Sequence, residues 1–127
     1  MKPHKTSLAF LEERLSAHNK VVNFTKTDEY FYKIQRCTGL VEINLLLVDC
    51  YTIGFAEYIY FKKEFPIANA IVTSSNWNRY TLDAKNAARQ EEVGLFNIGE
   101  FLGALNFDEF WNYVKKTDKE DPFAKDN

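Results

Sequence analysis

The chain has 127 residues, 46% of them hydrophobic, and this length suits one domain with a hydrophobic core of its own. Sixteen basic and eighteen acidic residues give a net charge of −2, which excludes the strongly basic field of a general nucleic-acid or membrane binder. No apolar run is long enough for a signal peptide or a membrane span, so we expect a soluble, cytoplasmic protein without a membrane partner.

The first part of the chain predicts a helix followed by two strands. Polar caps and a helical apolar period predict the helix from Thr6 or Ser7 to about Asn19. Two strand-like runs follow, over residues 21–25 and 30–37, and the polar stretch between them has the length of a hairpin. Their imperfect alternation is typical of strands near the edge of a sheet.

The middle of the chain predicts the centre of the sheet. Residues 41–51 contain the continuous apolar run from Leu45 to Val48, which is typical of a strand buried on both faces. The aromatic residues 54–65 predict a helix that Pro66 ends, and residues 70–73 predict a second buried strand.

The last part of the chain predicts alternating helices and strands. Thr81 is the expected N-cap of a helix, and residues 93–98 form the expected third buried strand. A further helix is expected from residue 100, interrupted and recapped at Asn106 by a capping box with Glu109. Its apolar stripe would cover the core or form a dimer surface, and consists of Phe107, Phe110, Trp111 and Val114.

These elements predict an α/β fold: a single domain over residues 1–116, with a mixed central sheet flanked by helices in the order α-β-β-β-α-β-α-β-α. Residues 117–127 are expected to be a charged, disordered tail. Cys37 and Cys50 lie in apolar contexts and are interpreted as small buried hydrophobes. Because both histidines lie near the amino terminus, no metal site is predicted.

The loop between the second buried strand and the helix capped by Thr81 is the predicted ligand-binding site. Loops at this position lie at the carboxyl end of a strand and the amino end of a helix, where polar ligands bind in many α/β proteins. The loop has no glycine, which excludes a Walker or dinucleotide-binding fingerprint. The alternative is a loop whose polar groups satisfy its own backbone. The predicted ligand-binding residues are Ser74, Ser75, Asn76, Trp77, Asn78, Arg79 and Thr81.

Asp49, at the end of the central strand, is the candidate catalytic residue, as a general base or metal ligand. The alternative is a carboxylate that accepts backbone N–H bonds. No spacing within one element forces a second carboxylate towards Asp49, although the sequence offers Asp28, Glu29, Glu42 and Glu57. A basic patch is a further expectation that competes with a solvated surface, and its members would be Lys26, Lys33, Arg36, Arg79, Lys85 and Arg89.

With this order of elements, the chain resembles the restriction-endonuclease-like (PD-D/ExK) fold, and most closely its Mrr-type branch. The resemblance rests on Ile71 to Ala88 followed by Val93 to Leu105. In that family an Asp on one strand and an acid-x-Lys on the next hold a magnesium ion and a water-activating lysine. Asp49 matches the acid, whereas Tyr51 stands where the lysine is expected. The resemblance therefore implies a degenerate motif, unless a lysine such as Lys33 or Lys62 replaces the missing one.

Three functions follow as hypotheses. The first is a non-catalytic or degenerate nuclease-fold module that binds nucleic acid or a nucleic-acid-processing partner, without a cofactor. The second is a Rossmann-like module that binds a small ligand, such as a nucleotide or anion, or a protein partner. The third is an active nuclease, which alone would need magnesium as a cofactor. The oligomeric state stays open, with a dimer as one option.

Overall fold

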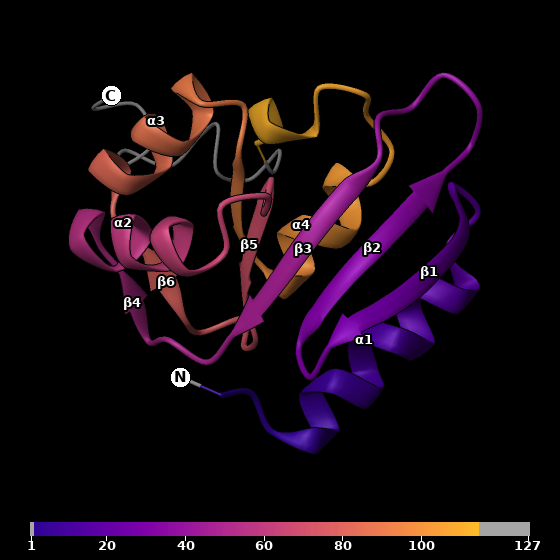
Figure 1. The fold of residues 1–127 in the computed structure, drawn as a ribbon, viewed down its shortest axis with the longest axis horizontal. Coiled ribbons are helices and arrows are strands. Elements are labelled where there is room, and N and C mark those ends of the chain that lie inside the picture. The colour runs from indigo at the N-terminus through magenta and orange to yellow at the C-terminus, as the bar shows by residue number, and fades with distance from the viewer. Residues whose placement is uncertain (1, 115–127) are drawn as a thin grey trace.

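The chain forms a five-stranded mixed sheet with helices on both faces (Figure 1). The computed structural model describes residues 2–114. The elements, in chain order, are α1 (Lys5–Ala17), β1 (Val21–Asp28), β2 (Phe31–Arg36), β3 (Ile43–Val48), β4 (Thr52–Ile53), α2 (Phe55–Glu64), β5 (Ala70–Thr73), β6 (Arg79–Tyr80), α3 (Leu82–Gln90), β7 (Gly94–Asn97), α4 (Ile98–Ala104) and the 3₁₀ helix η1 (Phe110–Asn112).

The expected fold class and element order are confirmed, with the short strands β4 and β6 and the turn of η1 added. The strand order in the large sheet is β1-β2-β3-β5-β7. The first three strands are antiparallel neighbours, whereas β3, β5 and β7 run parallel. The parallel strands are buried along most of their length, as the continuous apolar run in β3 predicts.

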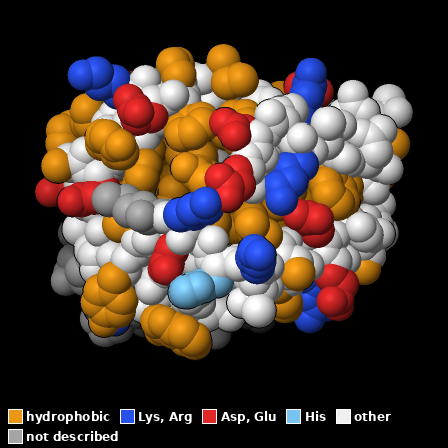
Figure 2. All heavy atoms as spheres, turned by 60° about the horizontal axis from the view of Figure 1, so that its bottom comes forward, with side chains coloured by type: hydrophobic (Ala, Val, Ile, Leu, Met, Phe, Trp, Pro, Cys, Tyr) orange, Lys and Arg blue, Asp and Glu red, His pale blue; other side chains and the backbone are white. Residues whose placement is uncertain are grey.

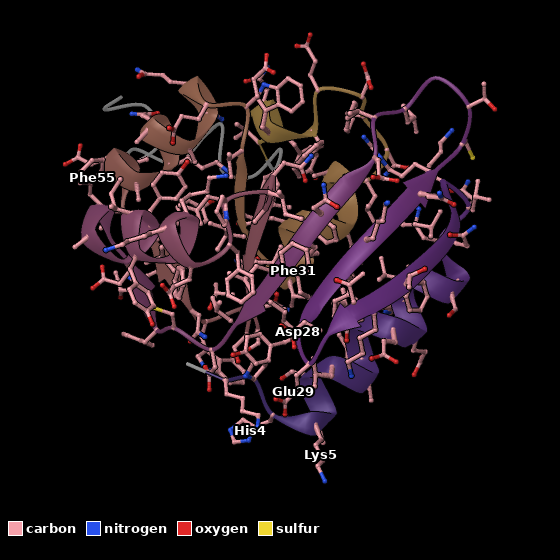
Figure 3. The ribbon with its side chains drawn as sticks, in the orientation of Figure 1. His4, Lys5, Asp28, Glu29, Phe31 and Phe55 are labelled. Carbon is pink, nitrogen blue, oxygen red and sulfur yellow. The ribbon has the colours of Figure 1, made fainter. Side chains whose placement is uncertain are left out.

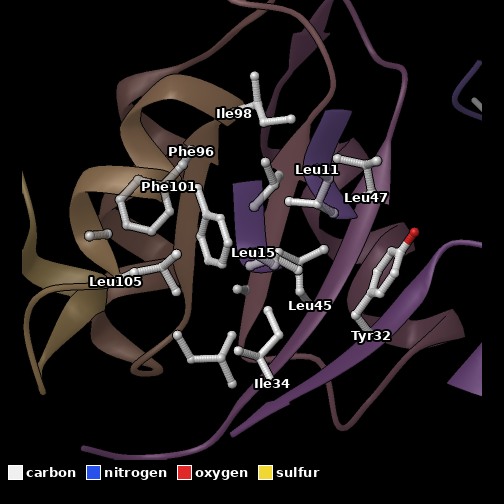
Figure 4. Packing of buried hydrophobic residues seen from close by; sticks show 14 of the residues in the cluster. Leu11, Leu15, Tyr32, Ile34, Leu45, Leu47, Phe96, Ile98, Phe101 and Leu105 are labelled. Atoms are coloured by element: carbon white, nitrogen blue, oxygen red, sulfur yellow. The ribbon is translucent and has the colours of Figure 1, made fainter. Parts of the chain in front are cut away.

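Two apolar cores cover the two faces of the sheet. One packs α1 and α4 on the sheet, and Figure 4 shows Leu11 and Leu15 of α1 and Phe101 of α4 facing residues such as Leu45. The other lies beneath α2 and α3. There the strand register aligns four apolar side chains in a row across the sheet, which are Phe31, Leu46, Ile71 and Leu95. The sheet is therefore rigid behind the loops at the carboxyl ends of its parallel strands.

Two buried cations bond backbone carbonyls of the edge strand β7 and of the segment after α4. The Lys85 ammonium donates to the Leu95 carbonyl of the edge strand β7 at 2.5 Å and lies 3.9 Å from the centre of the Phe96 ring. The Arg36 guanidinium is also buried, and it donates to the carbonyls of Leu105 and Phe107. Both side chains act as structural donors to backbone groups.

Two expected helix starts are wrong. The first helix begins at Lys5 after His4, so Thr6 and Ser7 lie inside its first turns and do not cap it. α4 begins before residue 100, at Ile98, because Asn97 accepts a hydrogen bond from the Glu100 backbone and the Glu100 side chain accepts one from the Asn97 backbone. This reciprocal pair is a capping box, and it differs from the expected box of Asn106 with Glu109.

The expected recapping at Asn106 is also wrong. The Asn106 amide donates to the Gly103 carbonyl, and up to residue 114 only the single turn of η1 follows. The physical reason is the Arg36 fork, which draws the backbone carbonyls of this segment towards β2 and keeps them from forming a helix. Phe110 is buried in the core, whereas Phe107 is exposed. The boundary expected at residue 116 and the expected tail lie outside the described residues.

None of the helices within residues 2–114 is long and apolar enough to cross a membrane. Both cysteines are free, with Cys50 buried and Cys37 half-buried.

Candidate functional site

The loop over residues 74–81 is fastened to the end of β3. The Ser74 backbone N–H donates to the Val48 carbonyl at 2.8 Å. The buried Asn78 amide donates to the Thr73 hydroxyl oxygen at 3.0 Å and to Asp49 Oδ1 at 3.3 Å. The Thr73 hydroxyl in turn donates to the Cys50 carbonyl. This chain of hydrogen bonds joins two neighbouring parallel strands at their carboxyl ends.

The loop is also fastened to both helices that follow it. The Gly99 backbone N–H, in the first turn of α4, donates to Asn76 Oδ1 at 3.0 Å. The Thr81 hydroxyl accepts from the Ala84 N–H and caps α3, as the sequence predicts. Asn76, Asn78 and Thr81 therefore use their side chains to hold the loop, and Ser74 is buried. Ser75 is half-buried, and its carbonyl accepts from the Asn78 N–H.

Side chains alternate between solvent and interior from Trp77 to Tyr80. Trp77 is 74% exposed and Arg79 is exposed, whereas Asn78 is buried and the Tyr80 hydroxyl donates to Glu100 at 2.7 Å. The two inward side chains anchor this stretch, and the two outward side chains face water.

A two-stranded parallel pairing of β4 with β6 brings Tyr51 to the same place. The Arg79 N–H donates to the Tyr51 carbonyl at 2.7 Å, and Thr52 is the strand partner of Arg79. The Tyr51 side chain is 65% exposed. Tyr51, Trp77 and Arg79 together are called the aromatic–arginine surface below. Sequence reasoning missed this pairing, because strands of two residues carry no periodic signal.

Asp49 lies half-buried where β3 ends, and its carboxylate accepts from Asn78. The neighbouring Cys50 thiol is buried and donates to the Thr52 carbonyl, and burial raises the pKa of this thiol. A thiol with a raised pKa stays protonated near neutral pH and is a poor nucleophile.

The other candidate carboxylates are occupied elsewhere. The Glu57 side chain accepts from the Gly54 N–H at the start of α2, and Glu42 pairs with Lys33 at 3.8 Å, at the opposite end of β3 from Asp49. Asp28 and Glu29 lie in the β1–β2 hairpin, beside the amino-terminal residues (Figure 3). In the part of the chain that the structure describes, no three His, Cys, Asp or Glu side chains gather in a way that could hold a metal ion.

The two lysines considered as substitutes for a lysine at the position of Tyr51 also have partners. Lys33 forms the ion pair with Glu42. The Lys62 ammonium donates to the carbonyls of Pro66 at 2.8 Å and Ala68 at 2.7 Å, and burial lowers the pKa of Lys62. Lys62 therefore closes the turn after α2.

The six basic residues considered as a patch come from four elements: Lys26 from β1, Lys33 and Arg36 from β2, Arg79 from β6, and Lys85 and Arg89 from α3. Arg36 and Lys85 are buried on backbone carbonyls. Lys26 pairs with Glu12 of α1 and lies by the Tyr32 ring, whereas Lys33 projects from the other face of the sheet. Of the six, only Arg79 belongs to the aromatic–arginine surface.

Comparisons with known proteins found no matching family model, no matching curated protein and no matching solved structure.

Proposed function

We propose that this protein is a non-catalytic module of nuclease-like fold that binds single-stranded nucleic acid through the aromatic–arginine surface. The observation that carries the proposal is that the pairing of β4 with β6, and the bond from the Arg79 N–H to the Tyr51 carbonyl, join the backbone segments that carry the exposed side chains of Tyr51, Trp77 and Arg79. Single-strand binders combine aromatic side chains, on which bases stack, with cations that meet phosphates. The order of helices and strands, on which the sequence resemblance partly rests, also supports the nuclease-like fold in this proposal.

The geometry favours this ligand over a small anion. The Asn78 amide donates to Thr73, and the side-chain oxygens of Asn76 and Thr81 accept hydrogen bonds from Gly99 and Ala84, so protein groups hold all three side chains in place. The outward positions instead carry large flat rings and one guanidinium, which match a base and a phosphate.

We propose a non-catalytic module because the described residues around Asp49 lack a lysine that could activate water. The residue two positions after it is Tyr51, whose neutral phenol cannot supply a cation. The nearest substitute on α2, Lys62, is held by two carbonyls at the turn after the helix. Asp49 itself serves as an acceptor for Asn78, which positions the loop.

The net charge of −2 and the single guanidinium at the site predict weak binding with a modest salt dependence. One guanidinium neutralises about one phosphate, so the logarithm of the affinity should fall with the logarithm of salt concentration with a slope near −0.7. Stacking on an exposed ring contributes about 1–3 kcal/mol per base. Trp77→Ala should therefore weaken binding roughly tenfold or more.

Fluorescence tests the proposal directly, because Trp77 and Trp111 are the two tryptophans of the chain. In a Trp111→Phe background Trp77 is the sole reporter. Single-stranded oligonucleotides should quench its emission at about 20 mM salt, and the affinity should be about fivefold lower at about 200 mM. Arg79→Ala should weaken binding several-fold. Lys5→Ala removes an exposed cation on a different element, α1, and serves as the matched control.

Two results would contradict the proposal. One is no binding of single-stranded DNA or RNA at low salt. The other is binding that leaves Trp77 emission unchanged and responds equally to Arg79→Ala and Lys5→Ala, because such binding would be a general charge effect.

A further inference from the structure

Among the elements that the structure describes, α2 carries the most exposed large apolar side chains. Phe55, Ile59 and Tyr60 are 53%, 47% and 54% exposed, although Tyr58 and Phe61 of the same helix are buried in the core. In Figure 2, which brings the lower end of Figure 1 forward, hydrophobic side chains gather on the left half of the face shown. Phe55 stands at the left margin of Figure 3, across the molecule from α1.

These residues form one stripe on the outer side of α2. Phe55, Ile59 and Lys63 are spaced at i, i+4 and i+8, with Ala56 and Tyr60 beside them, and all five are exposed. A helix normally turns polar residues outward, so an outer stripe with three large apolar residues indicates a contact surface. The stripe of these five residues is called the α2 stripe below.

We propose that the α2 stripe is a homodimer interface, in which α2 packs antiparallel against α2 of a second copy across a two-fold axis at Ile59. The proposal does not depend on the proposed function. A second copy is the expected partner, because a two-fold rotation about Ile59 makes the stripe complementary to itself. With Ile59 on the axis, Phe55 of each copy lies opposite Lys63 of the partner subunit, which allows two cation–π contacts.

Charge selects this orientation over the parallel one. A parallel pair would place Lys63 against Lys63 of the partner subunit and align the two helix dipoles, and both arrangements are repulsive. In the antiparallel pair the basic last turn of each helix, which contains Lys62 and Lys63, lies beside the first turn of the other. Ala56, near the crossing, allows the two helices to approach closely.

The size of the surface sets the expected affinity. Aromatic side chains bury roughly 150–250 Å² each, so the half-exposed Phe55 and Tyr60 offer on the order of 200 Å² between them, to which Ile59 and its neighbours add. Two copies would bury an area at the low end of specific interfaces, below about 1,200 Å². We therefore expect a reversible dimer with a dissociation constant on the order of 10–100 μM.

Sedimentation equilibrium of the full chain between about 5 and 500 μM tests the interface. The wild type should shift from monomer to dimer across this range. Ile59→Lys places two ammonium groups on the axis and should keep the chain monomeric throughout. Phe10→Lys is the matched control, because Phe10 is an exposed apolar residue on the outer side of α1, and it should leave the dimer unchanged.

A charge exchange tests the antiparallel register. In Phe55→Glu the new carboxylate faces Lys63 of the partner subunit, so the dimer should persist and become sensitive to salt. Adding Lys63→Glu to this variant places like charges together and should abolish the dimer. Circular dichroism of each variant separates loss of association from loss of folding.

Three results would overturn the proposal: a wild type that stays monomeric up to about 500 μM, a dimer that survives Ile59→Lys, or a dimer that Phe10→Lys weakens equally. Dimerisation that Phe55→Glu and the double variant affect alike would overturn the antiparallel register.

Discussion

Removing the buried guanidinium of Arg36 should destabilise the protein by about 3 kcal/mol. Arg36 is 6% exposed and donates to the carbonyls of Val41 at 2.9 Å, Leu105 at 3.0 Å and Phe107 at 2.7 Å. These bonds tie the end of β2 to the segment after α4. The positive charge also lies by the carboxyl end of that helix, where its dipole favours a cation.

The magnitude follows from which carbonyls water can reach. Leu105 is buried, so Arg36→Met leaves its carbonyl unpaired, which costs about 1–3 kcal/mol. Val41 and Phe107 are exposed, so water replaces part of their bonds, each worth about 1.5–3 kcal/mol to a charged donor. Removing a buried charge returns some desolvation energy, and burial accordingly lowers the pKa of Arg36. Arg36→Lys keeps the charge but loses the planar fork, so we expect a smaller loss.

Urea unfolding, followed by tryptophan fluorescence and circular dichroism, measures the effect. Lys33→Met is the control, because Lys33 lies two residues earlier on β2 and is exposed, and its removal should change stability by less than about 0.5 kcal/mol. The reasoning is refuted if Arg36→Met changes the free energy of unfolding by less than about 1 kcal/mol, or by no more than Lys33→Met does.

Three further predictions concern the loop and the helices around it. Burial and a hydrogen bond to Glu91 raise the pKa of Tyr58 above its ordinary value of 10.0; the folded protein thus keeps a proton that the unfolded chain releases, and stability should fall as pH rises above 10.0. The loss from this group should approach about 1.4 kcal/mol per pH unit, and Tyr58→Phe should remove it from the pH dependence of urea unfolding. Asn78→Asp should destabilise the fold by about 1–3 kcal/mol at neutral pH, because its carboxylate would face Asp49. Lowering the pH protonates these carboxylates and should restore part of this stability. Asn78→Leu, which introduces no charge, should show no such recovery. Thr81→Ala should lower the free energy of unfolding by about 1 kcal/mol, whereas Thr81→Ser should keep most of the cap; equal losses would contradict the capping role.

The periodic elements of this fold could be predicted from the sequence because their signals are local. The apolar run of β3, the helix that ends before Pro66 and the cap at Thr81 each depend on neighbours within a few residues. One of the failures has a local cause and the other a distant one. The His4 start of α1 has no side-chain cap to reveal it, and the helix expected after Asn106 gave way to backbone contacts with Arg36, a residue on a distant strand.

For the candidate site, too, the local features could be predicted and the long-range contacts could not. The position of the loop at the carboxyl end of β5 could be predicted, but the role of each of its side chains could not. From the sequence, Asn76 and Asn78 are candidate ligand-binding residues. In the structure their side chains bond Gly99 and Thr73 and hold the loop in place. Tyr51 joins the site only because β4 pairs with β6.

The sequence by itself determined where apolar and polar residues alternate, and therefore the fold class and the place of the loop. Only the tertiary structure decided which polar groups of that loop face water. A buried donor or acceptor must find a partner, and here the partners of Asn76 and Asn78 come from other elements. Trp77 and Arg79 stay exposed, as does Tyr51, whose carbonyl accepts from the Arg79 N–H, and these three residues form the surface that we propose for binding.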